Sequence, residues 1–135
     1  MSEMSDTAKA RPVYRNIHIS DLTSYRLPLA GFISILHRIS GVGLFLMLPF
    51  LLYLLDSSLE SPETFETFAA VVDSWFIKLV LFGLLWAYLH HFCAGIRFLM
   101  LDLHKGLELE EARKSSKIVL VVSLTLTLII GVVLW

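Results

Sequence analysis

Residues Trp75–Leu101 read WFIKLVLFGLLWAYLHHFCAGIRFLML, a stretch that is apolar apart from a few polar side chains. The hydrocarbon core of a bilayer is about 30 Å thick, and a helix of roughly 20 apolar residues crosses it. A helix also pairs every backbone N–H and C=O within the segment, which lipid requires. This stretch therefore predicts a transmembrane helix, and the rest of the fold follows from it.

Two further segments have the same character, residues 29–55 and residues 118–135. The chain of 135 residues is 56% hydrophobic and 17% charged, whereas soluble domains average about 45–50% and about 25%. We therefore predict an all-α membrane protein of one domain with three transmembrane helices, the second of them at residues 75–101. The net charge of −1 gives no sign of nucleic acid binding. The single cysteine, Cys93, excludes a disulfide framework.

The segments between the predicted helices differ in their content of Lys and Arg. Residues 56–74 contain neither, the N-terminal arm at residues 1–28 is basic, and residues 102–117 carry Lys105, Arg113, Lys114 and Lys117. Positively charged segments stay in the cytoplasm. We therefore expect the N-terminus and residues 102–117 to be cytoplasmic, and residues 56–74 and the C-terminus to be on the outer, periplasmic side.

The outer segment contains a helix signal of its own. Ser61-Pro62-Glu63 is typical of a helix start, with Pro62 at the first helical position. A short helix from Pro62 to Val71 is therefore predicted.

The first two predicted spans contain polar residues that are costly in lipid. On residues 29–55 these recur at i, i+3, i+4 and i+7 and so share one face: Ser34, His37, Arg38 and Gly41. Residues 75–101 contain His90, His91 and Arg97. Ionisable residues within spans usually face a bundle interior or a cofactor. Two plainer interpretations stay open: Arg38 reaching to the lipid headgroups, and a histidine that only bonds a neighbouring helix.

One of the two adjacent histidines is a candidate heme ligand, because neutral imidazole binds heme iron well. His91 has small residues within one turn on either side, Ala87, Ala94 and Gly95, which let a flat porphyrin approach the helix. His90 has Trp86 one turn before it. We therefore predict His91 as the axial ligand and keep His90 as the alternative.

The depth of His91 in the membrane places it at a height similar to that of the polar residues of the first predicted span. At 1.5 Å per residue, His91 lies roughly 24 Å from the outer edge of its span. Heme propionates would then meet the cytoplasmic boundary, where His37, Arg38 and Arg97 are available, and arginine matches carboxylates with a rigid fork of donors. A six-coordinate heme needs a second axial ligand, and we expect it to come from a partner subunit.

These residues carry a resemblance to a known family. Ser34-Ile35-Leu36-His37-Arg38-Ile39-Ser40-Gly41 resembles a signature of the succinate dehydrogenase cytochrome b subunit, the larger heme-binding membrane anchor of respiratory complex II in proteobacteria. A second signature is similar to His91, Gly95-Ile96-Arg97 and Asp102, and shorter matches lie at Arg11-Pro12, Ser61-Pro62-Glu63 and Arg113-Lys114-Ser115-Ser116-Lys117. The resemblance covers nearly the whole chain from Arg11 onward. One departure is Phe98, which stands where many relatives have a second histidine.

The resemblance implies a four-subunit succinate:ubiquinone oxidoreductase of the bacterial inner membrane, which links the tricarboxylic acid cycle to electron transport. Succinate oxidation belongs to a flavoprotein and an iron–sulfur subunit, and no catalytic residue for it is on this chain. Two membrane anchors hold heme b and ubiquinone. By position, His91 matches the axial ligand, with its counterpart on the second, smaller anchor. Ser34 and Arg38 match the quinone-binding pair, and His37 matches a residue near the propionates.

On this hypothesis Ser34 donates a hydrogen bond to a quinone carbonyl, and Arg38 stabilises the negative charge that develops on reduction. Two alternatives remain. One is the anchor of a quinol:fumarate reductase, since the sequence does not set the direction of electron flow. The other is a non-redox membrane protein, for assembly or proton relay, that uses the same buried polar residues.

Overall fold

The computed structural model describes residue 20 and residues 26–135, so the expectations for the arm before Arg26 lie outside the described residues. The elements are all helical: α1 (Leu29–Leu59), α2 (Pro62–Asp73), α3 (Trp75–Asp102) and α4 (Leu109–Leu134). By length and composition α1, α3 and α4 are able to cross a membrane. For the described residues the prediction of an all-helical fold with three long apolar helices is confirmed. The side of the membrane that each end faces stays a prediction.

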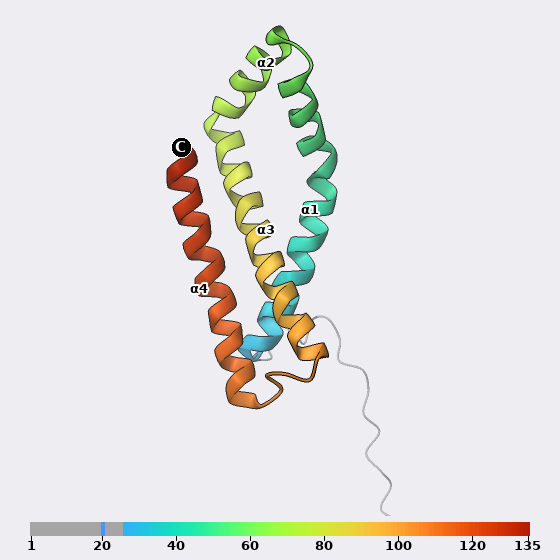
Figure 1. Cartoon of the computed structure of the whole chain (residues 1–135), viewed down its shortest axis with the longest axis vertical. Coiled ribbons are helices and arrows are strands. Elements are labelled where there is room, and N and C mark those ends of the chain that lie inside the picture. The colour runs from blue at the N-terminus through green and yellow to red at the C-terminus, as the bar shows by residue number, and fades with distance from the viewer. Residues whose placement is uncertain (1–19, 21–25) are drawn as a thin grey trace, which may run out of the picture.

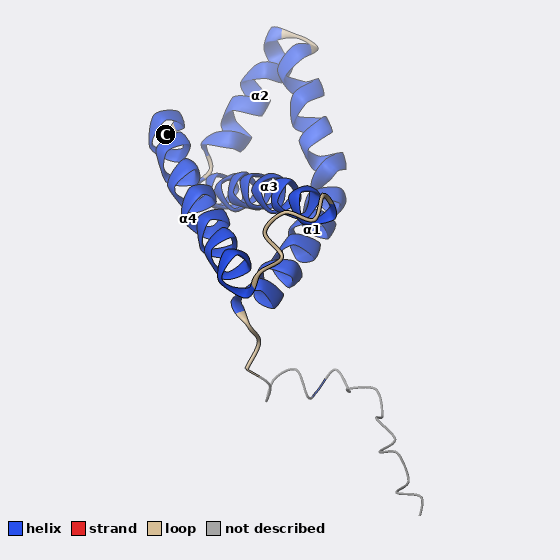
Figure 2. Cartoon of the chain, turned by 60° about the horizontal axis from the view of Figure 1, so that its bottom comes forward, coloured by secondary structure: helices blue, strands red, loops and turns tan. Residues whose placement is uncertain are grey.

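α3 is the central helix and packs antiparallel to both α1 and α4 (Figure 1). α1 and α3 lie together at the end that carries the α3–α4 loop, which we call the loop end, and they diverge toward the other end. There α2 lies between them and contacts both. Figure 2, turned so that the loop end comes forward, shows α3 foreshortened between α4 and α1. Polar groups of α1 and α3 near the loop end are therefore the ones brought into contact.

α2 begins where its sequence signal predicts. The Ser61 hydroxyl accepts a hydrogen bond from the Thr64 N–H at 3.2 Å, and the Thr64 hydroxyl accepts one from the Ser61 N–H at 2.9 Å. Pro62 follows as the first helical residue, where its missing N–H costs nothing. Beyond α2, Lys78 Nζ lies 2.6 Å from Asp73 Oδ1, and this hydrogen bond lowers the pKa of the Asp73 carboxyl. The short helix predicted in this segment is thus confirmed.

The α3–α4 loop stops α3 with a hydrogen-bonded cap. The Lys105 N–H donates to the Met100 carbonyl at 3.0 Å, and His104 takes the left-handed conformation with φ 58°. This is the Schellman arrangement that satisfies carbonyls at a helix end. Gly106, with φ 78°, then turns the chain toward α4.

The helices are longer than the apolar segments they contain. α1 continues to Leu59, and α4 begins at Leu109, so part of the basic segment 102–117 is helical. A helix continues beyond the hydrocarbon core as long as no residue breaks it, and residues such as Glu110, Ala112 and Lys114 are good helix formers. The boundaries of the membrane-spanning parts therefore stay a prediction.

α4 presents small residues to α3. Its buried residues recur every three, four or seven positions: Ser116, Val119, Ser123, Thr127 and Gly131. Lipid supplies no hydrophobic force between helices, so close packing through small residues is what holds them together. The hydroxyls are satisfied within α4 itself, as when Thr127 Oγ1 donates to the Ser123 carbonyl at 2.7 Å.

Gly131 of α4 packs closely against Phe82 of α3, and this contact yields a stability prediction. A Cβ at Gly131 would lie 2.5 Å from Phe82 Cε2, so Gly131→Ala should lower the free energy of unfolding by about 1–3 kcal/mol, as overpacking does. The measurement is denaturation of the purified protein by SDS. Gly83→Ala, whose Cβ meets nothing within 4 Å, controls for helix propensity. Equal stability of the two variants would contradict the prediction.

Candidate functional site

The imidazole rings of His37 on α1 and His91 on α3 are stacked in the loop-end half of the molecule. Their centroids are 4.1 Å apart, and their planes are inclined by 7°. His91 Nδ1 lies 3.0 Å from the main-chain carbonyl oxygen of His37. One turn of α1 therefore holds the His91 ring both by its face and by a ring nitrogen.

The contact with the carbonyl sets the tautomer of His91. A carbonyl oxygen only accepts, so Nδ1 carries the hydrogen and donates it. Ser40 Oγ donates to the same carbonyl at 2.9 Å and lies 3.3 Å from His91 Nδ1. Nε2 keeps its lone pair and has no hydrogen-bond partner within the described part of the chain. Metal-binding histidines use this arrangement, with one nitrogen on a carbonyl and the other free for the metal.

Gly41 gives the stacked pair the clearance that it needs, whereas a side chain at Gly95 would only make an ordinary contact with it. A Cβ at Gly41 would lie 2.8 Å from His91 Cε1, and one at Gly95 would lie 3.7 Å from His37 Nε2. The small surface beside Gly95, expected to admit a porphyrin, is here occupied by His37, which also contacts the Phe98 ring at 5.1 Å. Gly41 was noted in the sequence only as part of a face, because nothing local indicates its contact with His91.

His90 lies on a different side of α3 and is fully buried. Within the described residues, neither of its ring nitrogens has a partner, and neither does the buried Trp86 N–H next to it. An unpaired buried polar group costs about 1–3 kcal/mol. His91, by contrast, is partly exposed. A cofactor that is shared with a second chain has to be bound by a residue that is accessible at the surface of this chain. The burial pattern therefore favours His91 as the ligand.

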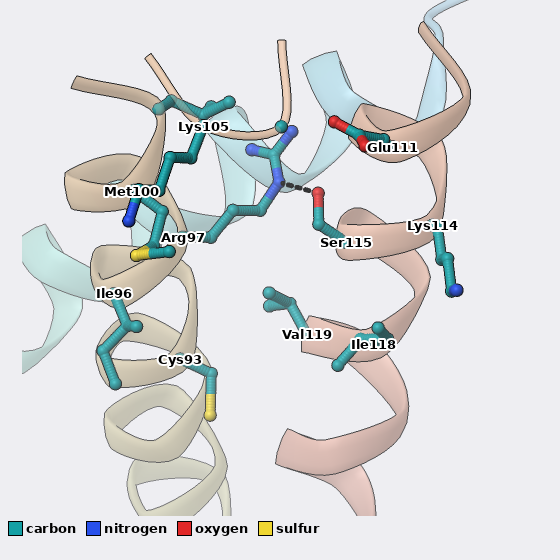
Figure 3. A pocket seen from close by; sticks show the side chains of 12 residues that line it. Cys93, Ile96, Arg97, Met100, Lys105, Glu111, Lys114, Ser115, Ile118 and Val119 are labelled. Carbon is teal, nitrogen blue, oxygen red and sulfur yellow. Dashed lines mark hydrogen bonds between the residues drawn. The ribbon is translucent and has the colours of Figure 1, made fainter. Parts of the chain in front are cut away.

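Arg97 is directed toward α4. Its Nε donates to Ser115 Oγ at 3.0 Å (Figure 3). Its Nη2 donates to the Ala112 carbonyl at 3.5 Å. The side chain is 7% exposed. The structure therefore does not bring Arg97 to His37, with which it was grouped in the sequence. Ser115 was not recognised as its partner, because a serine near the start of another helix gives no sequence signal.

Ser34 and Arg38 lie beside His37 on the surface of α1, both on the same side of it. They are four residues apart, about one turn of α1. At about 100° per residue both are rotated in the same direction from His37. Ser34 is partly buried and Arg38 is exposed. In the described part of the chain neither side chain forms a hydrogen bond, so both are available to a ligand that borders the histidine pair.

Comparison with known proteins shows the family to which the chain is similar. Residues 8–130 match the family described as succinate dehydrogenase/fumarate reductase transmembrane subunit. The succinate dehydrogenase cytochrome b556 subunit of Paracoccus denitrificans is 40% identical over 112 residues, which cover 81% of this chain and 86% of the relative. The subunit of the same name from Coxiella burnetii is 39% identical over 116 residues, which cover 85% of this chain and 93% of the relative. The corresponding subunit of Rickettsia felis is 32% identical over 111 residues, which cover 82% of this chain and 86% of the relative.

The close approach of His91 to Gly41 predicts a specific sensitivity. In Gly41→Ala the new methyl group would push the His91 ring away from its carbonyl partner, so heme should bind roughly 5- to 150-fold more weakly, the equivalent of an overpacking cost of about 1–3 kcal/mol. Heme affinity is measured by titrating the b-type absorption band. Gly43→Ala, whose Cβ meets nothing within 4 Å, is the matched control. Equal affinity in both variants would contradict the prediction.

Proposed function

Because the chain belongs to the succinate dehydrogenase/fumarate reductase transmembrane subunit family, we propose that it anchors a succinate:ubiquinone oxidoreductase, binds heme b and forms part of the ubiquinone-reduction site. As a membrane cytochrome b subunit it is one part of an enzyme complex. A flavoprotein and an iron–sulfur subunit oxidise succinate in such a complex. A second, small membrane anchor and the bacterial inner membrane complete the proposal.

His91 is the proposed axial ligand of the heme. The observation that carries this assignment is its Nδ1 donating to the His37 carbonyl, which leaves the Nε2 lone pair free. The partial exposure of His91 suits a heme whose second axial ligand comes from the other anchor. When bound, the heme supplies a site that stores one electron during the two-electron reduction of ubiquinone.

His37 and Arg38 are the proposed contacts of the heme propionates. Both lie on the turn of α1 that holds His91, and the exposed Arg38 guanidinium offers a planar fork of donors to a carboxylate. Arg97 was assigned to the propionates from the sequence as well. Its hydrogen bonds to α4 do not support that role, which stays a prediction.

Ser34 and Arg38 are proposed to bind ubiquinone. Ser34 Oγ donates a hydrogen bond to one quinone carbonyl, and Arg38 stabilises the negative charge that develops as electrons arrive from the iron–sulfur subunit. Arginine stays protonated in proteins, so Arg38 acts by its charge and does not itself release a proton. The two protons that ubiquinone takes up therefore do not come from Arg38 itself, and they are proposed to enter from the cytoplasmic side.

The names of the relatives support one direction of electron flow. The family description covers both succinate dehydrogenase and fumarate reductase, whereas the Paracoccus, Coxiella and Rickettsia proteins are all named succinate dehydrogenase subunits. Succinate oxidation is therefore the proposed physiological direction.

The two adjacent histidines provide the test of heme ligation. His91→Ala should remove at least about nine-tenths of the b-type absorption per complex, because an axial bond holds the iron. His90→Ala should keep the band and instead change stability. Absorption spectra of the affinity-purified complex give the result, and co-purification of the flavoprotein and iron–sulfur subunits shows that assembly is intact. A band lost in His90→Ala but kept in His91→Ala would assign the ligand to His90.

The quinone site is tested by separating two activities of the same complex. Ser34→Ala and Arg38→Lys should each lower succinate:ubiquinone reductase activity by about 10- to 100-fold, since the first loses a hydrogen-bond donor and the second loses the planar guanidinium fork that faces the developing charge. Succinate oxidation with a water-soluble dye as acceptor should be unchanged. Ser58→Ala serves as a control, because Ser58 bonds only the Leu55 carbonyl far from the site. Unaltered ubiquinone reduction in both variants would refute the assignment.

A further inference from the structure

A cavity of about 430 Å³ opens between α3 and α4 at the loop end (Figure 3). Its lining changes character along the helices. Nearest the loop it is lined by Arg97, Lys105, Glu111 and Lys114. Farther along the span its walls are apolar. An occupant that fills the whole cavity therefore has a polar head and an apolar tail.

The polar part of the cavity carries an excess of positive charge. Arg97, Lys105 and Lys114 contribute cations, and Glu111 contributes one carboxylate. Arg97 is held in place by Ser115 at 3.0 Å and lies between the two helices. Glu111 faces it from α4, whereas Lys105 extends past Met100 and Lys114 lies on the side of α4 away from Arg97 (Figure 3). A buried, hydrogen-bonded arginine loses little further freedom on binding an anion. This excess of positive charge favours an occupant whose polar head is negatively charged.

The apolar part is formed by Cys93, Ile96 and Met100 of α3 facing Ile118 and Val119 of α4. These side chains belong to the predicted spans and are one to three turns from the loop. Their surface suits a hydrocarbon chain that runs along the helices, and it offers nothing to the head of a water-soluble anion.

The cavity is separate from the histidine pair. At about 100° per residue, Cys93, Ile96 and Met100 lie on the opposite side of α3 from His91. A ligand here therefore leaves His91 and the quinone residues free. It shares only Arg97, whose predicted contact with the heme propionates its hydrogen bonds to α4 do not support. The inference does not depend on that proposed function.

We propose that this cavity is a binding site for an anionic phospholipid, with the phosphate at Arg97, the flexible side chains of Lys105 and Lys114 turning toward it, and an acyl chain along the apolar wall. Basic pockets between transmembrane helices near the headgroup level bind anionic lipids in this way. The site lies where the apolar span gives way to the charged loop, which is the height of the headgroups. A zwitterionic lipid fits the apolar wall equally well, but it cannot use the excess charge.

The test measures lipid association with the whole purified complex by native mass spectrometry. The complex is given phosphatidylglycerol and phosphatidylcholine with the same acyl chains. Phosphatidylglycerol should be retained preferentially, and Lys105→Ala/Lys114→Ala should weaken its association by about 5- to 30-fold, since a lysine near an anionic lipid contributes about fivefold. Arg97 is left unchanged.

The matched control is Arg113→Ala/Lys117→Ala. It removes the same charge from the start of α4, but neither residue lines the cavity. This variant should retain phosphatidylglycerol like the parent. An equal loss in both double variants would overturn the proposal, and so would equal retention of the two lipids. The b-type absorption and the bound partner subunits verify that each variant is assembled.

Two further experiments identify the molecule that occupies the cavity. Glycerol 3-phosphate and inorganic phosphate, at the concentration of the lipid, should not displace phosphatidylglycerol, and displacement by either would show that the head alone is bound. A photoreactive benzoylphenylalanine in place of Ile118 should form an adduct with the mass of phosphatidylglycerol. Cross-linking to another subunit instead would show that protein covers this groove, and the proposal would fail.

Discussion

The hydrogen bond from His91 Nδ1 to the main-chain carbonyl of His37 is the contact around which the α1–α3 interface is built. It lies in the half of the molecule where the two helices meet, and its geometry needs Gly41 for clearance and the His37 ring as a stacking partner. Because the acceptor is a backbone atom, its position is set by the helix itself. The ring is therefore oriented before any cofactor arrives.

Adjacent positions on a helix point about 100° apart, and this angle gives neighbouring histidines of α3 different environments. His91 faces α1 and remains partly exposed, whereas His90 is enclosed in the bundle, and both its nitrogens lack a partner in the part of the chain that the structure describes. Arg97 is seven residues after His90 and is engaged by α4. One helix thus presents a candidate heme ligand, His91, on one side and a hydrogen-bonded arginine, Arg97, on another.

α4 supports this division through close packing. Its small residues allow α3 to approach, and the contact of Gly131 with Phe82 and that of Ser115 with Arg97 fix the register of the two helices. The register places Arg97 beside the lysines of the loop end. The heme and quinone residues proposed on α1 and α3 are therefore separated, across the width of α3, from the positively charged cavity between α3 and α4.

The sequence by itself determined the number of long apolar helices, the shared face of Ser34, His37 and Arg38, and the short helix that begins at Pro62. These features depend on local length, periodicity and capping, which are visible in consecutive residues. The expected sides of the membrane also come from the sequence alone, through the positions of Lys and Arg.

Only the tertiary structure decided the tautomer of His91, the burial of His90, the role of Gly41 and the direction of Arg97. Each depends on which residue of another helix lies at the same height, and helix spacing along one chain does not specify that. His37 and His91 are far apart in the sequence, yet a backbone carbonyl of one sets the protonated nitrogen of the other. The physical reason is that helix–helix register in lipid is chosen by the fit of small and large side chains across the interface.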